Sequence, residues 1–233
     1  MQYIAIPKLT ARGLQINENK TEEYHIAKDG TSEWKKCKIL GSLLDTEQDI
    51  HRRKLLAHNS MQKLKYIYTN NKLANKIKIR IFNACTESIF LYNSELWTAS
   101  KKIENKIDSF HRRLLRKAIN IKWPKKISNE KLYRITQQEK WSDKIRSRRL
   151  RWYGHAERLP EESPAKIALE EARRKVKKNR GGQQITWLAI IEKDLKKLNI
   201  TPEDARKYVK DRIEWRKIVR RAEAPCAQAR SAS

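Results

Sequence analysis

The sequence predicts a mainly α-helical protein: a multi-helix array with a small α/β or β-hairpin element at its N-terminus. From Thr46 onward, apolar residues recur with the 3.6-residue period of a helix. The convincing strand and turn signals lie within the first 45 residues. Ser, Thr and Pro stand where helices would begin, and Gly or Pro where they would end. A chain of 233 residues is long enough to bury a sizeable core.

The N-terminal strand signal comes from residues 22–27 and 35–44, which we expect to pair as a hairpin around Asp29-Gly30. Three helical stripes follow, over residues 50–68, 77–96 and 103–121. KIKIRI (76–81) alternates like a strand, but the longer helical pattern outweighs those six residues. Ser100 is the expected N-cap of the third helix.

The later helices are delimited by turn chemistry. Trp123-Pro124 is expected to stop the third helix, and Gly154 to end or bend a later one. The expected helix starts are Ser128, Ser142, Ser163-Pro164, Thr186 and Thr201-Pro202. We therefore expect four regions: 1–45 with the hairpin, a helical bundle over 46–124, a basic helical region over 125–222, and a disordered tail over 223–233.

The net charge of +27 is distributed unevenly. Residues 1–50 carry seven basic and eight acidic side chains, whereas residues 51–233 have a net charge of +28. A field of one sign favours phosphate-rich partners. The expected partners are therefore RNA, DNA or an RNA–DNA hybrid, with no small-molecule substrate and no membrane.

Three basic clusters, at residues 111–118, 146–153 and 172–180, supply the candidate contacts. Arg112 and Arg116 are four residues apart, so they share a helical face and can follow a phosphate backbone. Trp152 has two interpretations, a core residue or a base-stacking platform. The candidate nucleic-acid-binding residues are Arg112, Arg113, Arg116, Lys117, Arg148, Arg149, Arg151, Trp152, Arg173 and Arg174.

No catalytic or metal site is expected. Adjacent aspartates, a P-loop and an HExxH motif do not occur in the sequence. Residues 45–56 begin like a calcium loop, but Ile50 stands where glycine is needed and Leu56 where a bidentate glutamate is needed. No cofactor is therefore expected.

The three cysteines, Cys37, Cys85 and Cys226, are too far apart for a metal finger and suit a reducing compartment. Cys37 and Cys85 lie in apolar patterns typical of a core. A signal peptide and a membrane-spanning apolar run are not recognisable. We expect an intracellular protein, nuclear and/or cytoplasmic, and not secreted.

Six segments, in order, resemble the C-terminal part of non-LTR (LINE-type) retrotransposon reverse transcriptases. They are GLQINENKTE (13–22), CKILGSLLD (37–45), FLYNSELWT (90–98), FHRRLLRKAINIKW (110–123), RRLRWYGHAERL (148–159) and DRIEWRKIV (211–219). The resemblance implies a palm remnant, a thumb over the helices from Ile50 to Ile121, and a basic post-thumb region. Ile39 and Asn93 depart from the family pattern, which has tyrosine and glycine there.

The resemblance also implies residue roles. Lys20 matches the lysine placed beside the departing pyrophosphate, and Leu40 and Gly41 match the primer-grip hairpin. The paired catalytic aspartates have no counterpart in this sequence, so the chain by itself is expected to be catalytically inactive. Mg²⁺ is expected only for an intact polymerase, and an intact reverse transcriptase is a candidate partner. Two alternatives stay open: a stand-alone helical DNA- or RNA-binding protein derived from such an element, and a non-functional relic.

Overall fold

The computed structural model describes residues 13, 15, 17, 37–174 and 185–223. The chain divides into two compact units, Met1–Asp45 and Thr46–Ser233. Regular structure in the described ranges is helical apart from one two-stranded antiparallel hairpin. The predicted fold class, mainly α with a small β hairpin, is therefore confirmed.

The hairpin lies at the end of the first unit. β1 (Lys38–Ile39) pairs with β2 (Ser42–Leu43). The chain reverses at Leu40-Gly41, where φ is 47° and 81°. Positive φ at both central residues matches the twist of a two-residue hairpin. The expectation that residues 35–44 form one long strand is therefore wrong. The hairpin expected around Asp29-Gly30 lies largely outside the described residues.

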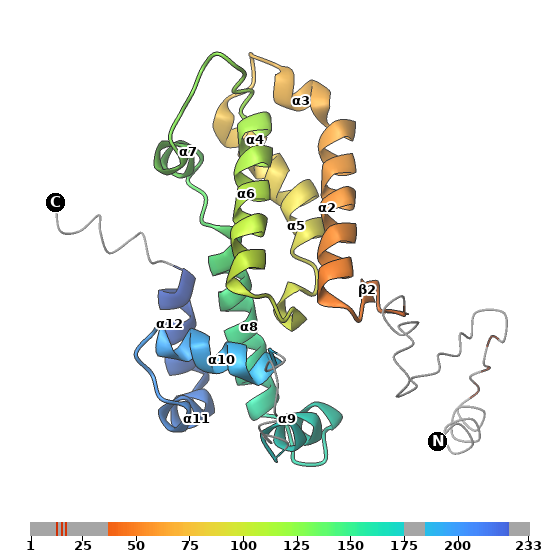
Figure 1. The fold of residues 1–233 in the computed structure, drawn as a ribbon, viewed down its shortest axis with the longest axis vertical. Coiled ribbons are helices and arrows are strands. Elements are labelled where there is room, and N and C mark those ends of the chain that lie inside the picture. Colours follow the sequence, from red (N-terminus) through yellow and green to blue (C-terminus); the bar gives the residue numbers. More distant parts are fainter. Residues whose placement is uncertain (1–12, 14, 16, 18–36, 175–184, 224–233) are drawn as a thin grey trace. The chain divides into compact units, whose positions relative to one another are not determined.

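The second unit begins with helices that pack around one hydrophobic cluster (Figure 1). Their bounds are α2 Thr46–Lys63, α3 Lys65–Thr69, α4 Asn75–Phe82, a π-helical turn Asn83–Glu87, α5 Ser88–Phe90, a 3₁₀ turn Ser94–Leu96, and α6 Lys101–Ala118. The helical interpretation of KIKIRI is confirmed, because those residues form most of α4.

The prediction that the apolar stripe over residues 77–96 is buried is wrong. Ile77 and Leu96 are about half exposed, at 47 % and 52 %, and Cys85 is exposed rather than in the core. The neighbouring stripe is buried instead, including Phe82 and Phe90 at 0 % exposure. Both faces of this segment carry apolar residues, and the larger aromatic rings bury the greater area.

Trp141 is the centre of the first cluster. Its ring, fully buried, stacks on Phe90 with 4.2 Å between centroids and on His111 with 4.4 Å. The indole N–H donates to Glu87 Oε2 at 2.7 Å, and Lys144 Nζ lies 2.7 Å from Glu87 Oε1. One side chain of α8 thereby joins α5, α6 and the π-helical turn.

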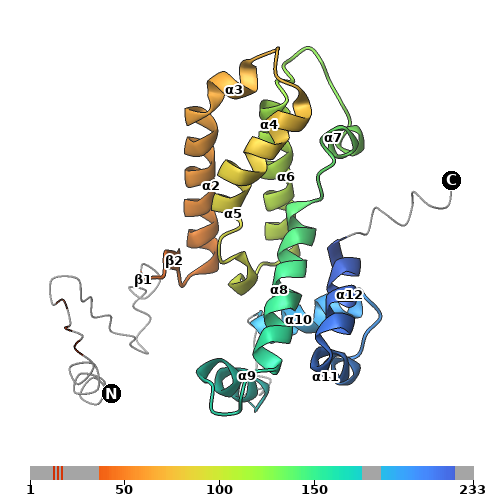
Figure 2. The same ribbon diagram turned by 180° about the vertical axis from the view of Figure 1, so that it is seen from behind.

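The remaining helices complete the unit (Figure 2). They are α7 Asn129–Thr136, α8 Trp141–Glu157, α9 Pro164–Arg174, α10 Trp187–Lys196, α11 Pro202–Lys210 and α12 Arg212–Glu223. α8 supplies Trp141 and Ile145 to the first cluster, and Leu150 and Tyr153 to a second one with α10, α11 and α12. Residues on both sides of position 124 thus belong to one compact unit.

Most expected helix starts are confirmed. The side chains of Ser100, Ser128, Thr186 and Thr201 each accept a hydrogen bond from an amide in the first turn. The helix start expected at Ser142 is wrong. This residue lies inside α8, and its hydroxyl donates to Asp108 Oδ2 at 2.7 Å.

The helix end expected at Gly154 is also wrong, because α8 continues through it to Glu157. A Cβ atom at Gly154 would lie 2.1 Å from Nε1 of Trp215, so the glycine lets α12 approach closely. The indole N–H of Trp215 donates to the Leu150 carbonyl at 3.1 Å. The helix that starts after Thr201 ends before Asp211, where ψ is 112°, and α12 follows it.

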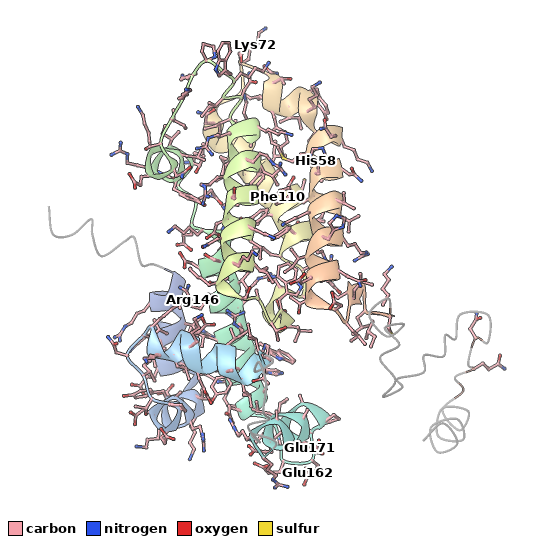
Figure 3. All side chains as sticks on the ribbon, in the orientation of Figure 1. His58, Lys72, Phe110, Arg146, Glu162 and Glu171 are labelled. Atoms are coloured by element: carbon pink, nitrogen blue, oxygen red, sulfur yellow. The ribbon has the colours of Figure 1, made fainter. Side chains whose placement is uncertain are left out.

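A buried ion pair ties α8 to α10. Arg149 and Asp194 are 0 % and 1 % exposed, and Arg149 NH2 lies 2.7 Å from Asp194 Oδ2. Arg149 NH1 also donates to the Trp97 carbonyl at 3.2 Å. Arg146, labelled in Figure 3, lies 3.4 Å from the other carboxylate oxygen. The three contacts hold the two hydrophobic clusters together.

We predict that Arg149→Met will lower the free energy of unfolding by about 3–5 kcal/mol, because it leaves the Asp194 carboxylate buried without its main partner. Urea denaturation followed by circular dichroism measures the change. Arg149→Met combined with Asp194→Leu removes both charges and should recover most of the loss. A neutral single substitution would contradict the structural role.

We also predict that His111 makes stability dependent on pH. Burial lowers its pKa well below the ordinary value, and the charges of Lys144 and Arg112 lower it further. Since the folded-state pKa lies below the unfolded one, the unfolded chain binds one more proton as pH falls below about 6.5. Stability is then lost toward acid, by up to ~1.4 kcal/mol per pH unit.

The measurement is urea denaturation at several pH values on either side of neutrality. His111→Phe retains a ring in the stack and should flatten the dependence below about pH 6.5. His51→Phe, on an exposed position of α2, is the matched control and should not. Equal slopes for the native chain and His111→Phe would sink the prediction.

Candidate nucleic-acid interface

Four exposed cations of α6 form a single stripe. Lys102, Lys106, Arg113 and Lys117 are all exposed. Their spacings of four, eleven and fifteen residues from Lys102 place them on one side of the helix. At 1.5 Å per residue the stripe is about 22 Å long, a length that spans several phosphates of a nucleic-acid backbone.

A cation from α2 joins this stripe. Lys54 Nζ lies 5.9 Å from the centroid of the Phe110 ring, and Arg113 Cζ lies 5.3 Å from it. Phe110 is labelled in Figure 3, where α6 faces α2. Burial lowers the pKa of Lys54, and the positive charges of Lys106 and Arg113 lower it further. We call Lys54, Lys102, Lys106, Arg113 and Lys117 the α6 face.

The positively charged side chains of the α6 face therefore repel one another, and a bound anion would reduce that repulsion. Like charges on neighbouring side chains destabilise one another, and each would gain from a phosphate placed between them. Arg113 and Lys117 were predicted from the sequence. Lys102 and Lys106 were missed, although their spacing from Arg113 is visible in the sequence, and Lys54 could be found only from the packing of α2 on α6.

Arg149 was predicted to contact phosphate, and this is wrong. Its guanidinium is buried and holds Asp194, because the helix turns that position toward α10. Arg116 also makes hydrogen bonds within the chain. Its Nη2 donates to the Ile127 carbonyl at 3.3 Å and to Asn129 Oδ1 at 2.8 Å. Arg112 shares the face of Arg116, as expected, and is half-buried.

The second and third basic clusters are divided in the same way. Arg148 donates to the Leu91 carbonyl and lies 3.7 Å from Glu95 Oε2, while Arg151 is exposed. Arg173 pairs with the carboxylates of Glu157 and Glu170, while Arg174 is exposed. In each cluster one arginine is held by contacts within the fold and another is displayed at the surface.

Trp152 lies at the surface, with 36 % of its area exposed. Its ring packs on His155 at 5.3 Å between centroids. The interpretation of Trp152 as a core residue is therefore wrong, since the helix points it away from the second cluster. His155 is exposed.

An open hollow of about 410 Å³ lies beside the π-helical turn. It is lined by Asn83, Glu87, Ser88, Leu91, Glu139, Lys144, Arg148 and Arg151. Lys144 is already paired with Glu87 at 2.7 Å. Because the lining contains carboxylates as well as cations, the hollow is a poorer phosphate site than the α6 face.

Three residues were implied by the family resemblance. Leu40 and Gly41 form the turn of the β1–β2 hairpin, and Leu40 is 82 % exposed. Lys20 lies outside the described residues. Within the described ranges, no three His, Cys, Asp or Glu side chains come together as a metal site, and no helix is both long and apolar enough to cross a membrane.

Comparison with known proteins gives a distant similarity. The chain is 24 % identical over 182 residues to an uncharacterized transposon-derived protein of Caenorhabditis elegans. The alignment covers 74 % of this chain and 64 % of that protein, so the chain spans less than two thirds of the relative's length. No protein-family model and no solved structure matches the chain. The similarity indicates a transposon origin.

Proposed function

We propose that the chain is the thumb and post-thumb part of a non-LTR retrotransposon reverse transcriptase, and that it grips nucleic acid through the α6 face. The observation that carries the proposal is the stripe of four exposed cations on one side of α6, joined by the half-buried Lys54 of α2. The six ordered segments of family resemblance and the similarity to a transposon-derived protein support the element of origin.

The chemistry of this face favours contact with the backbone over reading of bases. Its donors are lysine ammonium groups and one guanidinium, which bind phosphate without regard to sequence. Asn and Gln side chains, which pair with adenine edges, are not among the residues of the α6 face. A grip of this kind lets a polymerase hold a duplex whose sequence changes at every step.

We predict that changing Lys102, Lys106, Arg113 and Lys117 together to Gln will weaken binding to a nucleic-acid duplex. Each lost phosphate contact should reduce the slope of log K against log salt by about 0.9. Fluorescence anisotropy between about 50 and 200 mM salt measures affinity and slope together.

The matched control changes four other exposed cations to Gln: Lys196, Lys210, Arg216 and Arg220. It removes the same net charge from α10, α11 and α12. If both variants lose affinity equally, net charge alone drives binding and the α6 face is not an interface. Circular dichroism confirms that each variant is folded.

The ligand preference separates the polymerase from its alternatives. An RNA–DNA hybrid, duplex DNA and single-stranded RNA are compared at about 200 mM salt, where purely phosphate-driven binding is weakest. An advantage for the hybrid supports a polymerase thumb. Specific binding to duplex DNA or to RNA would instead favour a stand-alone binding protein, and loss of all three ligands together a non-functional relic.

A further inference from the structure

The connection between α6 and α7 displays a tryptophan at its tip. Trp123 is 85 % exposed, whereas Trp97, Trp141 and Trp215 are each at most 3 % exposed. An indole is one of the largest apolar side chains, so leaving it in water forgoes a large gain from burial. A tryptophan held in this position is suited to contact a partner.

The backbone around Trp123 is constrained. The Lys125 amide donates to the Lys122 carbonyl at 3.0 Å, which closes a four-residue turn with Trp123 at one corner. On either side of the turn, Ile121 and Ile127 pack against the first hydrophobic cluster. The turn is therefore tethered to the core at both ends.

Two polar contacts add to the tether. Arg116 donates to the Ile127 carbonyl at 3.3 Å, and Asn120 Nδ2 donates to Asn71 Oδ1 at 3.4 Å. The second contact brings the α6–α7 connection beside the α3–α4 connection, as Figures 1 and 2 show. Lys72, labelled in Figure 3, is an exposed cation of that neighbouring connection.

Exposed cations flank Trp123 in the sequence of this turn. Lys122, Lys125 and Lys126 are all exposed, and Lys117 of the α6 face precedes Lys122 by five residues. An indole offers a flat surface on which any base can stack, and ammonium groups beside it neutralise the flanking phosphates. Together they form a platform with a positive rim at the end of the α6 face.

We propose that Trp123 is a base-stacking platform that binds an unpaired base at the end of a nucleic-acid duplex, with Lys122, Lys125 and Lys126 on the adjoining phosphates. This rests on the proposed function, since it places the single strand where the gripped duplex ends. Cations that contact only the phosphates of a duplex cannot distinguish its end from its middle. The platform gives the chain a preference for junctions between paired and unpaired nucleic acid.

A nucleic acid suits the site better than an anionic membrane. Insertion into a membrane needs a broad apolar surface, such as one face of an amphipathic helix. Here one exposed ring is flanked in sequence by three exposed lysines, and Lys117 of the α6 face precedes it by six residues. Stacking on a single base requires no more apolar surface than one indole provides.

The test compares two ligands for the full chain: a duplex with a short single-stranded overhang, and a covalently closed circular duplex without unpaired bases. Trp123→Ala should lower affinity for the overhang duplex by about tenfold or more, the effect of losing one stacked base. It should leave affinity for the closed duplex unchanged. The salt slope should also stay the same, because no phosphate contact is lost. Trp123→Phe should retain most of the affinity.

A second readout detects stacking directly. The fluorescence of 2-aminopurine placed in the overhang should be quenched by the native chain and not by Trp123→Ala. Equal binding of the overhang duplex by the native chain and Trp123→Ala, or unchanged quenching, would overturn the proposal. If Trp123→Ala no longer binds phosphatidylserine vesicles that the native chain binds, and still binds the overhang duplex normally, Trp123 contacts a membrane. That result would overturn the proposal as well.

The variant of the α6 face separates this proposal from the proposed function. Its four substitutions should weaken binding to both ligands, whereas Trp123→Ala should weaken binding to the overhang duplex alone. If the α6-face variant binds normally and Trp123→Ala does not, the duplex grip is wrong and the platform stands. The reverse result leaves the grip and removes the platform. Unfolding experiments on Trp123→Ala should show native stability, because the side chain lies outside the core.

Discussion

The stack of Trp141 between Phe90 and His111 is the contact on which the rest of the helical unit depends. It brings the N-terminal end of α8 into the first hydrophobic cluster and fixes it against α5 and α6. Its indole N–H is satisfied by Glu87, and Glu87 is in turn neutralised by Lys144. A large ring can be buried here without cost because its polar atom has a charged partner.

From Trp141 onward, α8 runs from the first hydrophobic cluster to the second and contributes side chains to both. Its C-terminal half enters the second cluster through Leu150 and Tyr153. The Arg149–Asp194 pair then locks α10 onto it. His111, Leu115 and Ala118 are buried on one side of α6, so the opposite side faces solvent, and the exposed cations Lys102, Lys106, Arg113 and Lys117 lie on that side.

The distribution of carboxylates explains how a strongly basic chain folds and still displays positive charge. The acidic side chains of Asp49, Asp194, Glu87 and Glu157 lie inside or at the edge of the helical packing, where each is paired with a cation or an indole N–H. These acids neutralise the inward-facing basic residues, such as Arg149. The basic residues of the α6 face and of the turn around Trp123 protrude from the same framework, and a polyanion is the natural partner for them.

The sequence by itself determined the fold class, most of the helix starts and the excess of positive charge. These follow from local rules: the helical period, the capping side chains of Ser100, Ser128, Thr186 and Thr201, and composition. Tertiary structure alone decided which arginines are buried. Arg149 and Arg151 are two residues apart in one basic run, yet Arg149 is buried and Arg151 is exposed. The choice depends on Asp194, 45 residues later in the chain, and no local pattern contains that information.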